Sequence, residues 1–252
     1  MSDQETRRQA QAASFDRAAE VYERARPSYP EPAVDWIFEG LPAEPAVLDL
    51  GAGTGKLTRA LAGRAGQLFA VDPSEQMLRQ LRAALPGVRA EIGTAERIPL
   101  PDSSLDLVVA AQAWHWVDPV VAEPEVDRVL RPGGRLALIW NVRDDRVPWV
   151  ARLAEVMEPS SAENYVEDYA ATLTSSFGPF ERFTTTWQRP FDRASLLDLV
   201  ASRSHYIVAD ESERAAILTA VGHFLDTDPE LGGATSWSMP YRTEVFRVTT
   251  PR

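Results

Sequence analysis

Short apolar runs alternate with amphipathic stretches through the middle of the chain, one strand-like run to each helix-like stretch. The runs lie at residues 47–50, 68–71, 88–92, 105–110 and 136–140, and the third is the most polar, as expected near a sheet edge. Between them leucine recurs at helical spacing, as at Leu78, Leu81 and Leu85. This alternation predicts an α/β fold with a parallel, doubly wound sheet over residues 46–142.

The two ends of the chain show other patterns. Residues 1–13 are polar and aperiodic, and two helical patterns separated by a proline-rich segment occupy the rest of the stretch up to residue 45. After residue 142 we expect an insertion over 143–180 that is helical over residues 148–177. Strands are then expected at 183–187 and 241–249, with helices over 195–225 between them. The 252 residues are expected to form a single domain.

Composition excludes several classes of function. The chain has no cysteine, which removes disulfides, thiolate nucleophiles and iron–sulfur clusters. None of its three histidines stands at the spacing of a zinc-ligand pair, so no metal site is predicted. The formal net charge of −11 disfavours a nucleic acid as partner.

Membrane insertion and secretion are not expected either. No uncharged stretch approaches the roughly 20 residues that span a bilayer. The N-terminal sequence MSDQETRRQAQAAS lacks the apolar segment of a secretory signal. We therefore expect a cytoplasmic protein that acts on a small molecule.

A glycine-rich turn follows the first strand, in the sequence VLDLGAGTG over residues 47–55. Glycines at such a turn let the backbone bend sharply and let a ligand approach without a Cβ in the way. The next helix begins there, and its free N–H groups favour a carboxylate or phosphate. Asp49 precedes the first glycine by two residues. Asp72 ends the second strand, where a carboxylate can accept both hydroxyls of a ribose.

Two classes of cofactor bind at turns of this kind. The dinucleotide fingerprint G-x-G-x-x-G requires glycine at position 56, where this chain has Lys56, and the pattern present is G-x-G-x-G. A dinucleotide has no use for the carboxylate of Asp49, which can accept from the ammonium group of an amino-acid-bearing nucleoside. The turn therefore predicts S-adenosylmethionine as the cofactor. A P-loop is excluded, because leucine follows Lys56.

Four sequence blocks in this order resemble the class I S-adenosylmethionine-dependent methyltransferases, especially the family of the ubiquinone-pathway and trans-aconitate methyltransferases. The blocks are VLDLGAGTGKLTRAL, AVDPSEQML, GTAERIPLPDSSLDLVVAAQAWHW and RVLRPGGRLALIWN, and the resemblance covers residues 14–142. It implies a Rossmann-like sheet of seven strands in the order 3-2-1-4-5-7-6, with the last strand antiparallel. Residues 1–45 would form a lid and 46–142 the cofactor-binding core. Residues 143–180 would cap the substrate, and 181–252 would complete the sheet.

The resemblance also implies a set of cofactor contacts. The glycine-rich turn would hold the methionine end, the second strand the ribose and the loops that follow the adenine. Gln112 would lie beneath the methionyl group. The implied residues are Asp49, Gly51, Ala52, Gly53, Thr54, Gly55, Asp72, Pro73, Met77, Thr94, Ala95, Glu96 and Gln112. Pro124 is expected to break the helix that follows the fourth strand.

Methyl transfer from a sulfonium is an in-line displacement that depends on positioning, with a base only where the acceptor must lose a proton. His115, in the segment QAWHWVD after the fourth strand, is the candidate base; the alternative is that it packs or hydrogen-bonds within its turn. Trp114 is expected in the core, whereas Trp116 is either a substrate contact or a core residue. Tyr22 and Arg26 in the N-terminal segment are further candidate substrate contacts, or else surface residues.

The expected function is methylation of a small molecule at a carboxylate or hydroxyl oxygen, by a monomer or homodimer that uses S-adenosylmethionine. A stretch similar to Trp-His-Trp-Val occurs in the trans-aconitate and juvenile hormone acid methyltransferases, which favours a carboxylate. The sequence leaves three alternatives open. They are transfer to carbon or nitrogen, a non-methylating enzyme such as a cyclase on the same fold, and a non-catalytic cofactor-binding protein.

Overall fold

A computed structural model describes residues 25–157, 166, 174–175, 177–203, 206–207 and 209–250. The chain divides into two compact units. One, here called the sheet unit, comprises Ser28–Val142, Ser161–Trp187 and Tyr241–Arg252. The other, the helical unit, comprises Met1–Pro27, Arg143–Ser160 and Gln188–Pro240. The single-domain organisation and its expected internal boundaries stay a prediction.

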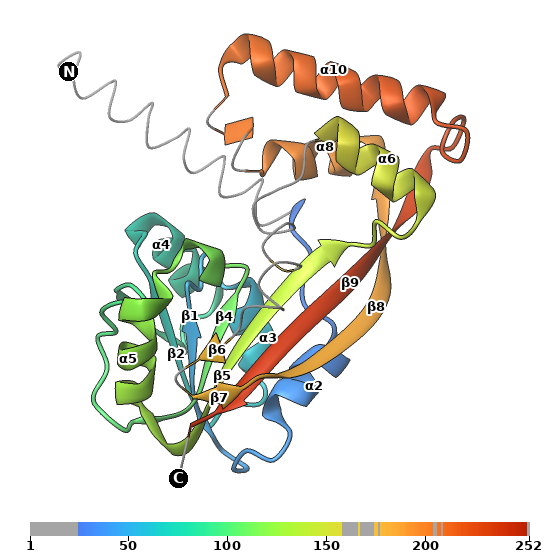
Figure 1. Cartoon of the computed structure of the whole chain (residues 1–252). Helices are drawn as coiled ribbons and strands as arrows, with labels where there is room; N and C mark the ends of the chain where they lie inside the picture. The colour runs from blue at the N-terminus through green and yellow to red at the C-terminus, as the bar shows by residue number, and fades with distance from the viewer. Residues whose placement is uncertain are drawn as a thin grey trace, which may run out of the picture. The chain divides into compact units, whose positions relative to one another are not determined.

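A seven-stranded sheet in the order β3-β2-β1-β4-β5-β9-β8 is the centre of the sheet unit (Figure 1). Neighbouring strands from β3 to β5 are parallel, and β9 runs in the opposite direction. The expected strand order and the antiparallel seventh strand are therefore confirmed, with β8 and β9 as the sixth and seventh strands. The strands are β1 (Ala46–Leu50), β2 (Gln67–Asp72), β3 (Arg89–Ile92), β4 (Leu105–Ala111), β5 (Leu130–Arg143), β8 (Glu181–Asp192) and β9 (Ser236–Thr249).

Helices cover both faces of this sheet, which explains why its central strands are apolar throughout. Alternate residues of β5 pack into two different hydrophobic clusters, one on each face of the sheet. Ile139 packs with Ile37 of α2 (Glu31–Phe38) and Leu61 of α3 (Lys56–Leu61). Leu138, on the other face, packs with Val126 of α5 (Pro119–Val129). Helix α4 (Glu75–Ala84) packs through Leu78 and Leu81 beside β2.

The expected break at Pro124 is wrong, because α5 continues through it to Val129. Asp118 caps the helix by accepting the Val120 N–H at 3.0 Å. A proline inside a helix loses one backbone hydrogen bond. Burial of one apolar helix face, including Val126 and Val129, outweighs that loss.

The helical unit contains α6 (Pro148–Met157), α8 (Arg193–Ala201) and α10 (Glu211–Thr227). Both later helices begin with a capping box, formed by Asp192 and Ser195 in α8 and by Asp210 and Glu213 in α10. The helices expected over 195–225 are confirmed. The helix expected over 148–177 is confirmed at 148–157. It is wrong at residues 174–175, where β6 (Thr174–Ser175) forms a small antiparallel pair with β7 (Gly178–Pro179). Within the described part of the chain, no helix is long and apolar enough to cross a membrane.

Candidate cofactor and active site

The glycine-rich turn bends sharply between β1 and α3. Gly51 has a φ of +75°, and a Cβ there would lie 2.6 Å from the Cβ of Ala113, so only glycine fits. Gly53 also has a positive φ, of +54°, but a Cβ on it would meet open space. The turn is held against the second strand, because Gly51 N donates to Val71 O at 2.8 Å. Gly51 is therefore required by packing, whereas the backbone at Gly53 faces open space.

Asp49 is fully buried at the end of β1, and one of its two carboxylate oxygens is satisfied. Oδ2 accepts the Thr58 hydroxyl at 2.6 Å, whereas Oδ1 is buried without a hydrogen-bond partner among the described residues. Burial, with a smaller contribution from the nearby carboxylate of Asp72, raises the pKa of Asp49 to about 7. A buried carboxylate oxygen that lacks a donor is costly, and a cationic ligand group would satisfy it. This arrangement fits the ammonium group of S-adenosylmethionine.

Asp72 at the end of β2 is oriented by two backbone donors. Gly53 N donates to its Oδ2 at 2.9 Å, and Ser74 N donates to its Oδ1 at 2.8 Å. Burial raises the pKa of Asp72, and these two hydrogen bonds oppose the rise. A carboxylate has about four acceptor positions, so two remain for the hydroxyls of a ribose.

The residues expected around the adenine follow β2 and β3 directly. Gly93 N donates to the backbone oxygen of Asp72 at 3.3 Å, so the loop with Thr94, buried Ala95 and Glu96 begins beside that carboxylate. Met77 lies in the first turn of α4, where its N–H donates to the Ser74 cap, and Pro73 is exposed. Desolvation acts to raise the pKa of Glu96. Hydrogen bonds from its own backbone, Thr94 and the Asp118 N–H outweigh it, and the net shift is downward.

Gln112 is held in a left-handed conformation just after β4, with a φ of +53°. Its Nε2 donates to the backbone oxygen of Asn141 at 2.7 Å. The Asn141 side chain donates to Ser28 O at 3.1 Å and accepts the hydroxyl of Thr243 at 2.6 Å. That hydroxyl in turn accepts a hydrogen bond from Trp187 Nε1 at 2.8 Å. Gln112 is therefore fixed at the end of a chain of polar contacts.

Asn141 and Thr243 were not expected from the sequence as part of the site. Asn141 ends the apolar run LALIWN, and a polar residue at that place in a buried strand is a signal that could have identified it. Nothing local to the sequence indicates Thr243, because its partner lies 102 positions away.

The segment after β4 forms a short 3-10 helix, η1 (Trp114–Trp116), in which the two tryptophans have different exposure. Trp114 is 1% exposed in the core, as predicted. Trp116 is 69% exposed, so the core interpretation of it is wrong. The half-buried His115 ring lies 4.8 Å from the Trp116 ring, centre to centre, at an angle of 44°. Its role as a base stays a prediction.

The structure describes one of the other two expected substrate contacts. Tyr22 lies outside the described residues. Arg26 belongs to the helical unit, where its Nε donates to the hydroxyl of Ser202 at 3.2 Å and its Nη2 to the Ser202 backbone oxygen at 3.3 Å.

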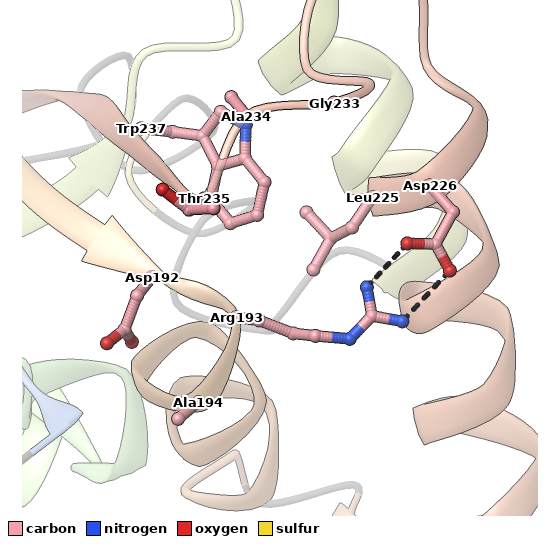
Figure 2. A pocket seen from close by; sticks show the side chains of 9 residues that line it. All are labelled: Asp192, Arg193, Ala194, Leu225, Asp226, Gly233, Ala234, Thr235 and Trp237. Atoms are coloured by element: carbon pink, nitrogen blue, oxygen red, sulfur yellow. Dashed lines mark hydrogen bonds and ion pairs between the residues drawn. The ribbon is translucent and has the colours of Figure 1, made fainter.

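The helical unit also has a pocket of about 400 Å³ (Figure 2). Arg193 and Asp226 at its wall pair through two contacts of 2.8 and 3.0 Å, and none of the expected cofactor residues lines it.

Comparisons with known proteins identify the family. Residues 48–138 match a family described as the methyltransferase domain. An uncharacterized methyltransferase of Mycobacterium tuberculosis is 48% identical over 236 residues, which cover 94% of this chain and 95% of that protein. A malonyl-[acyl-carrier protein] O-methyltransferase of Methylococcus capsulatus is 42% identical over 102 residues, or 38% of this chain and 37% of that protein.

Among solved structures, one from Anaeromyxobacter dehalogenans assigned to the type II methyltransferases has a TM-score of 0.68 and 27% identity. The match covers 90% of this chain and 99% of that one. The chain thus belongs to the methyltransferase family and has the class I fold. It is an S-adenosylmethionine-dependent methyltransferase.

Proposed function

We propose that this enzyme transfers a methyl group to an oxygen of a small organic acceptor, and that the oxygen belongs to a carboxylate. The observation that carries this proposal is that few candidate general bases lie at the carboxyl ends of the strands. Among the described residues there, Asp49 and Asp72 are suited to the cofactor, and Glu96 is engaged by hydrogen bonds. His115 is the remaining candidate base among them. An acceptor that is already ionised requires none of them as a base.

The name of one relative supports the same chemistry. The malonyl-[acyl-carrier protein] O-methyltransferase shares 102 aligned residues with this chain, and its name specifies transfer to oxygen. The shared segment is less than half of either protein, so it supports the reaction class and not the acceptor.

The residues of the site have separate tasks in this reaction. When bound, S-adenosylmethionine supplies an electrophilic methyl group and leaves as S-adenosylhomocysteine. Asp49 would accept from the ammonium group, whose positive charge favours the ionised carboxylate and lowers its pKa from about 7. Asp72 would accept from the ribose hydroxyls while Gly53 and Ser74 keep it in place.

The acceptor end of the site depends on position more than on proton transfer. A carboxylic acid is ionised above about pH 5, so no residue has to remove a proton. Gln112, fixed by Asn141, would define the floor beneath the reacting groups. Holding two reactants in line can contribute several kcal/mol, roughly 7–11 in the best cases, to lowering the barrier. We also propose a cytoplasmic monomer or homodimer that binds no nucleic acid, which the net charge of −11 supports.

Methyl transfer can be tested with S-adenosylmethionine labelled in its methyl group. The enzyme is incubated with a panel of carboxylic acids, their primary amides and the corresponding alcohols. We expect label in the acid samples only, in a product that releases methanol in mild alkali, because an ester hydrolyses there and an ether or an N- or C-methyl group does not. Alkali-stable label would contradict a carboxylate acceptor. A failure to form S-adenosylhomocysteine with any acceptor in the panel would favour the cyclase or non-catalytic alternatives.

A further inference from the structure

The buried carboxylate of Asp49 is held by one side chain of the protein, the hydroxyl of Thr58. Thr58 lies in α3 and has no exposed surface. Its hydroxyl donates to Asp49 Oδ2 at 2.6 Å. The other oxygen, Oδ1, has no hydrogen-bond partner among the described residues. Thr58 therefore fixes one oxygen of the carboxylate and leaves the other available to a ligand.

Packing alone does not explain a threonine at this position. Threonine is mostly an exposed residue, and β-branched residues are slightly unfavourable in helices. Its neighbours Leu57 and Leu61 in α3 belong to the apolar core, where a valine of the same shape would pack as well. The hydroxyl of Thr58 is directed across to the end of β1, at Asp49. Its contribution is therefore the hydrogen bond to that carboxylate.

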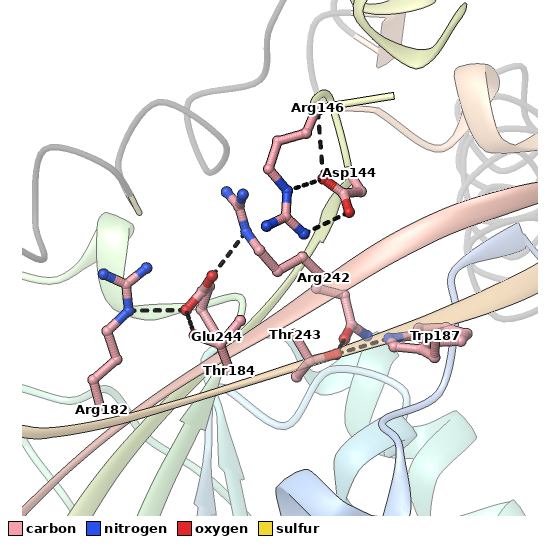
Figure 3. Close-up of polar contacts among 9 residues, drawn as sticks. Asp144, Arg146, Arg182, Thr184, Trp187, Arg242, Thr243 and Glu244 are labelled. Atoms are coloured by element: carbon pink, nitrogen blue, oxygen red, sulfur yellow. Dashed lines mark hydrogen bonds and ion pairs between the residues drawn. The ribbon is translucent and has the colours of Figure 1, made fainter. Parts of the chain in front are cut away.

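A second buried carboxylate of the sheet unit, Glu244 on β9, shows what Asp49 lacks. Glu244 also accepts a threonine hydroxyl, from Thr184 at 2.6 Å. In addition it pairs with the guanidinium groups of Arg182 at 3.0 Å and Arg242 at 2.8 Å (Figure 3). Asp49 forms no ion pair with a residue that the structure describes. A buried charge requires compensation, which the ammonium group of S-adenosylmethionine would supply at Asp49.

Thr58 also favours the ionised form of Asp49. Burial raises the pKa of Asp49 most, and the carboxylate of Asp72 on β2 raises it further. Hydrogen bonds from the side chain and backbone of Thr58 lower the pKa, and the result is a value of about 7. Among the described residues, Asp72 is the one charged group that acts on Asp49 from the elements packed around it. Without Thr58, nothing in the described protein would oppose protonation of the carboxylate.

We infer that Thr58 is a positioning residue of the cofactor site, which acts through Asp49 by orienting its carboxylate and keeping it ionised for the ammonium group of S-adenosylmethionine. The inference rests on the proposed contact between Asp49 and that ammonium group. Its consequence is that a fully buried hydroxyl sets the pH range in which the enzyme binds its cofactor.

The inference can be tested with Thr58→Val, which removes the hydroxyl and keeps the shape of the side chain. The affinity for S-adenosylhomocysteine, which carries the same ammonium group, is measured calorimetrically as a function of pH. The wild-type affinity should fall on the acid side of about pH 7. Loss of a hydrogen bond to a charged group should move this acid limb upward by about one pH unit. The variant should then bind about ten-fold more weakly than the wild type at about pH 6, and within about two-fold of it at about pH 8.5.

Thr58→Ser is the matched control, because it keeps the hydroxyl and should restore the acid limb to its wild-type position. Thr58→Ala also lacks the hydroxyl, and it replaces the valine variant in the experiment if that variant fails to fold. In an Asp49→Asn background, Thr58→Val should have no pH-dependent effect on affinity, because the group through which it acts no longer titrates.

Two results would overturn the inference on its own. They are an acid limb that Thr58→Val leaves in place, and a loss of affinity of the same size at both pH values, because a purely structural role weakens binding without moving a pH profile. A wild type without an acid limb, together with Asp49→Asn that binds as tightly as the wild type, would contradict the proposed contact of Asp49 and the inference with it.

Discussion

At the scale of single residues, the buried carboxylate of Asp49 makes stability and cofactor binding depend on pH. Its folded-state pKa of about 7 lies above the value of about 3.9 in an unfolded chain. The folded state therefore binds the proton more tightly, and stability falls as pH rises from about 4 through about 7. The shift corresponds to a destabilisation of up to roughly 4 kcal/mol above pH 7.

Asp49→Asn should remove this dependence. We expect the unfolding free energy of the variant, measured by urea denaturation without cofactor, to exceed that of the wild type by more at about pH 8 than at about pH 5. Cofactor affinity of the wild type should fall as pH drops through 7, because the bound form requires the ionised carboxylate. A difference between the two proteins that is the same at both pH values would contradict the assignment.

His115 is the residue whose role depends on the acceptor. With a carboxylate acceptor, His115→Ala should lower kcat less than about ten-fold, and kcat at saturating cofactor should show no acid limb near the pKa of a histidine. A hydroxyl acceptor would instead make the loss about 10²–10⁴-fold. His223→Ala, which alters an exposed histidine on α10, serves as the control in the same steady-state assay. A large loss with a carboxylic acid substrate would contradict the proposal.

At the scale of elements, the end of β5 positions the end of β4 through Asn141. Asn141→Ala removes the side-chain contacts to Ser28 and Thr243 and should let the backbone that holds Gln112 shift. We expect a loss of about 10–100-fold in kcat with a smaller change in cofactor affinity, because the change affects alignment more than binding. Thr243→Val leaves the Asn141 contact to Ser28 in place and removes the Thr243 hydroxyl, which also accepts from Trp187 Nε1. This variant should lose less in kcat. Equal losses in kcat for both variants would contradict a positioning role for Asn141.

The comparison of sequence and structure also belongs at this scale. The strands β1 to β5 and the glycine-rich turn were predictable because their signals are local, in runs of apolar residues and in glycine spacing. The hydrogen bond from Thr184 to Glu244 was not predictable, because the two residues lie 60 positions apart and meet only when β8 pairs with β9. Trp114 and Trp116 lie two positions apart in one segment, and only the turn of η1 shows that Trp116 is exposed while Trp114 is buried.

At the scale of the whole molecule, the expected cofactor residues from Asp49 to Gln112 all belong to the sheet unit, whereas α8 and α10 belong to the helical unit. A ligand stabilises the part of the protein that it contacts, by about 2.7 kcal/mol at a hundred times its dissociation constant. Saturation with S-adenosylhomocysteine should therefore slow amide hydrogen exchange in the turns after β1, β2 and β4, which carry the expected cofactor contacts. Peptides from α10 (Glu211–Thr227) provide an internal reference and should exchange at the same rate with and without it. Exchange followed by mass spectrometry distinguishes the outcomes, since equal protection of α10 and the turns would mean that the two units respond to the cofactor as one.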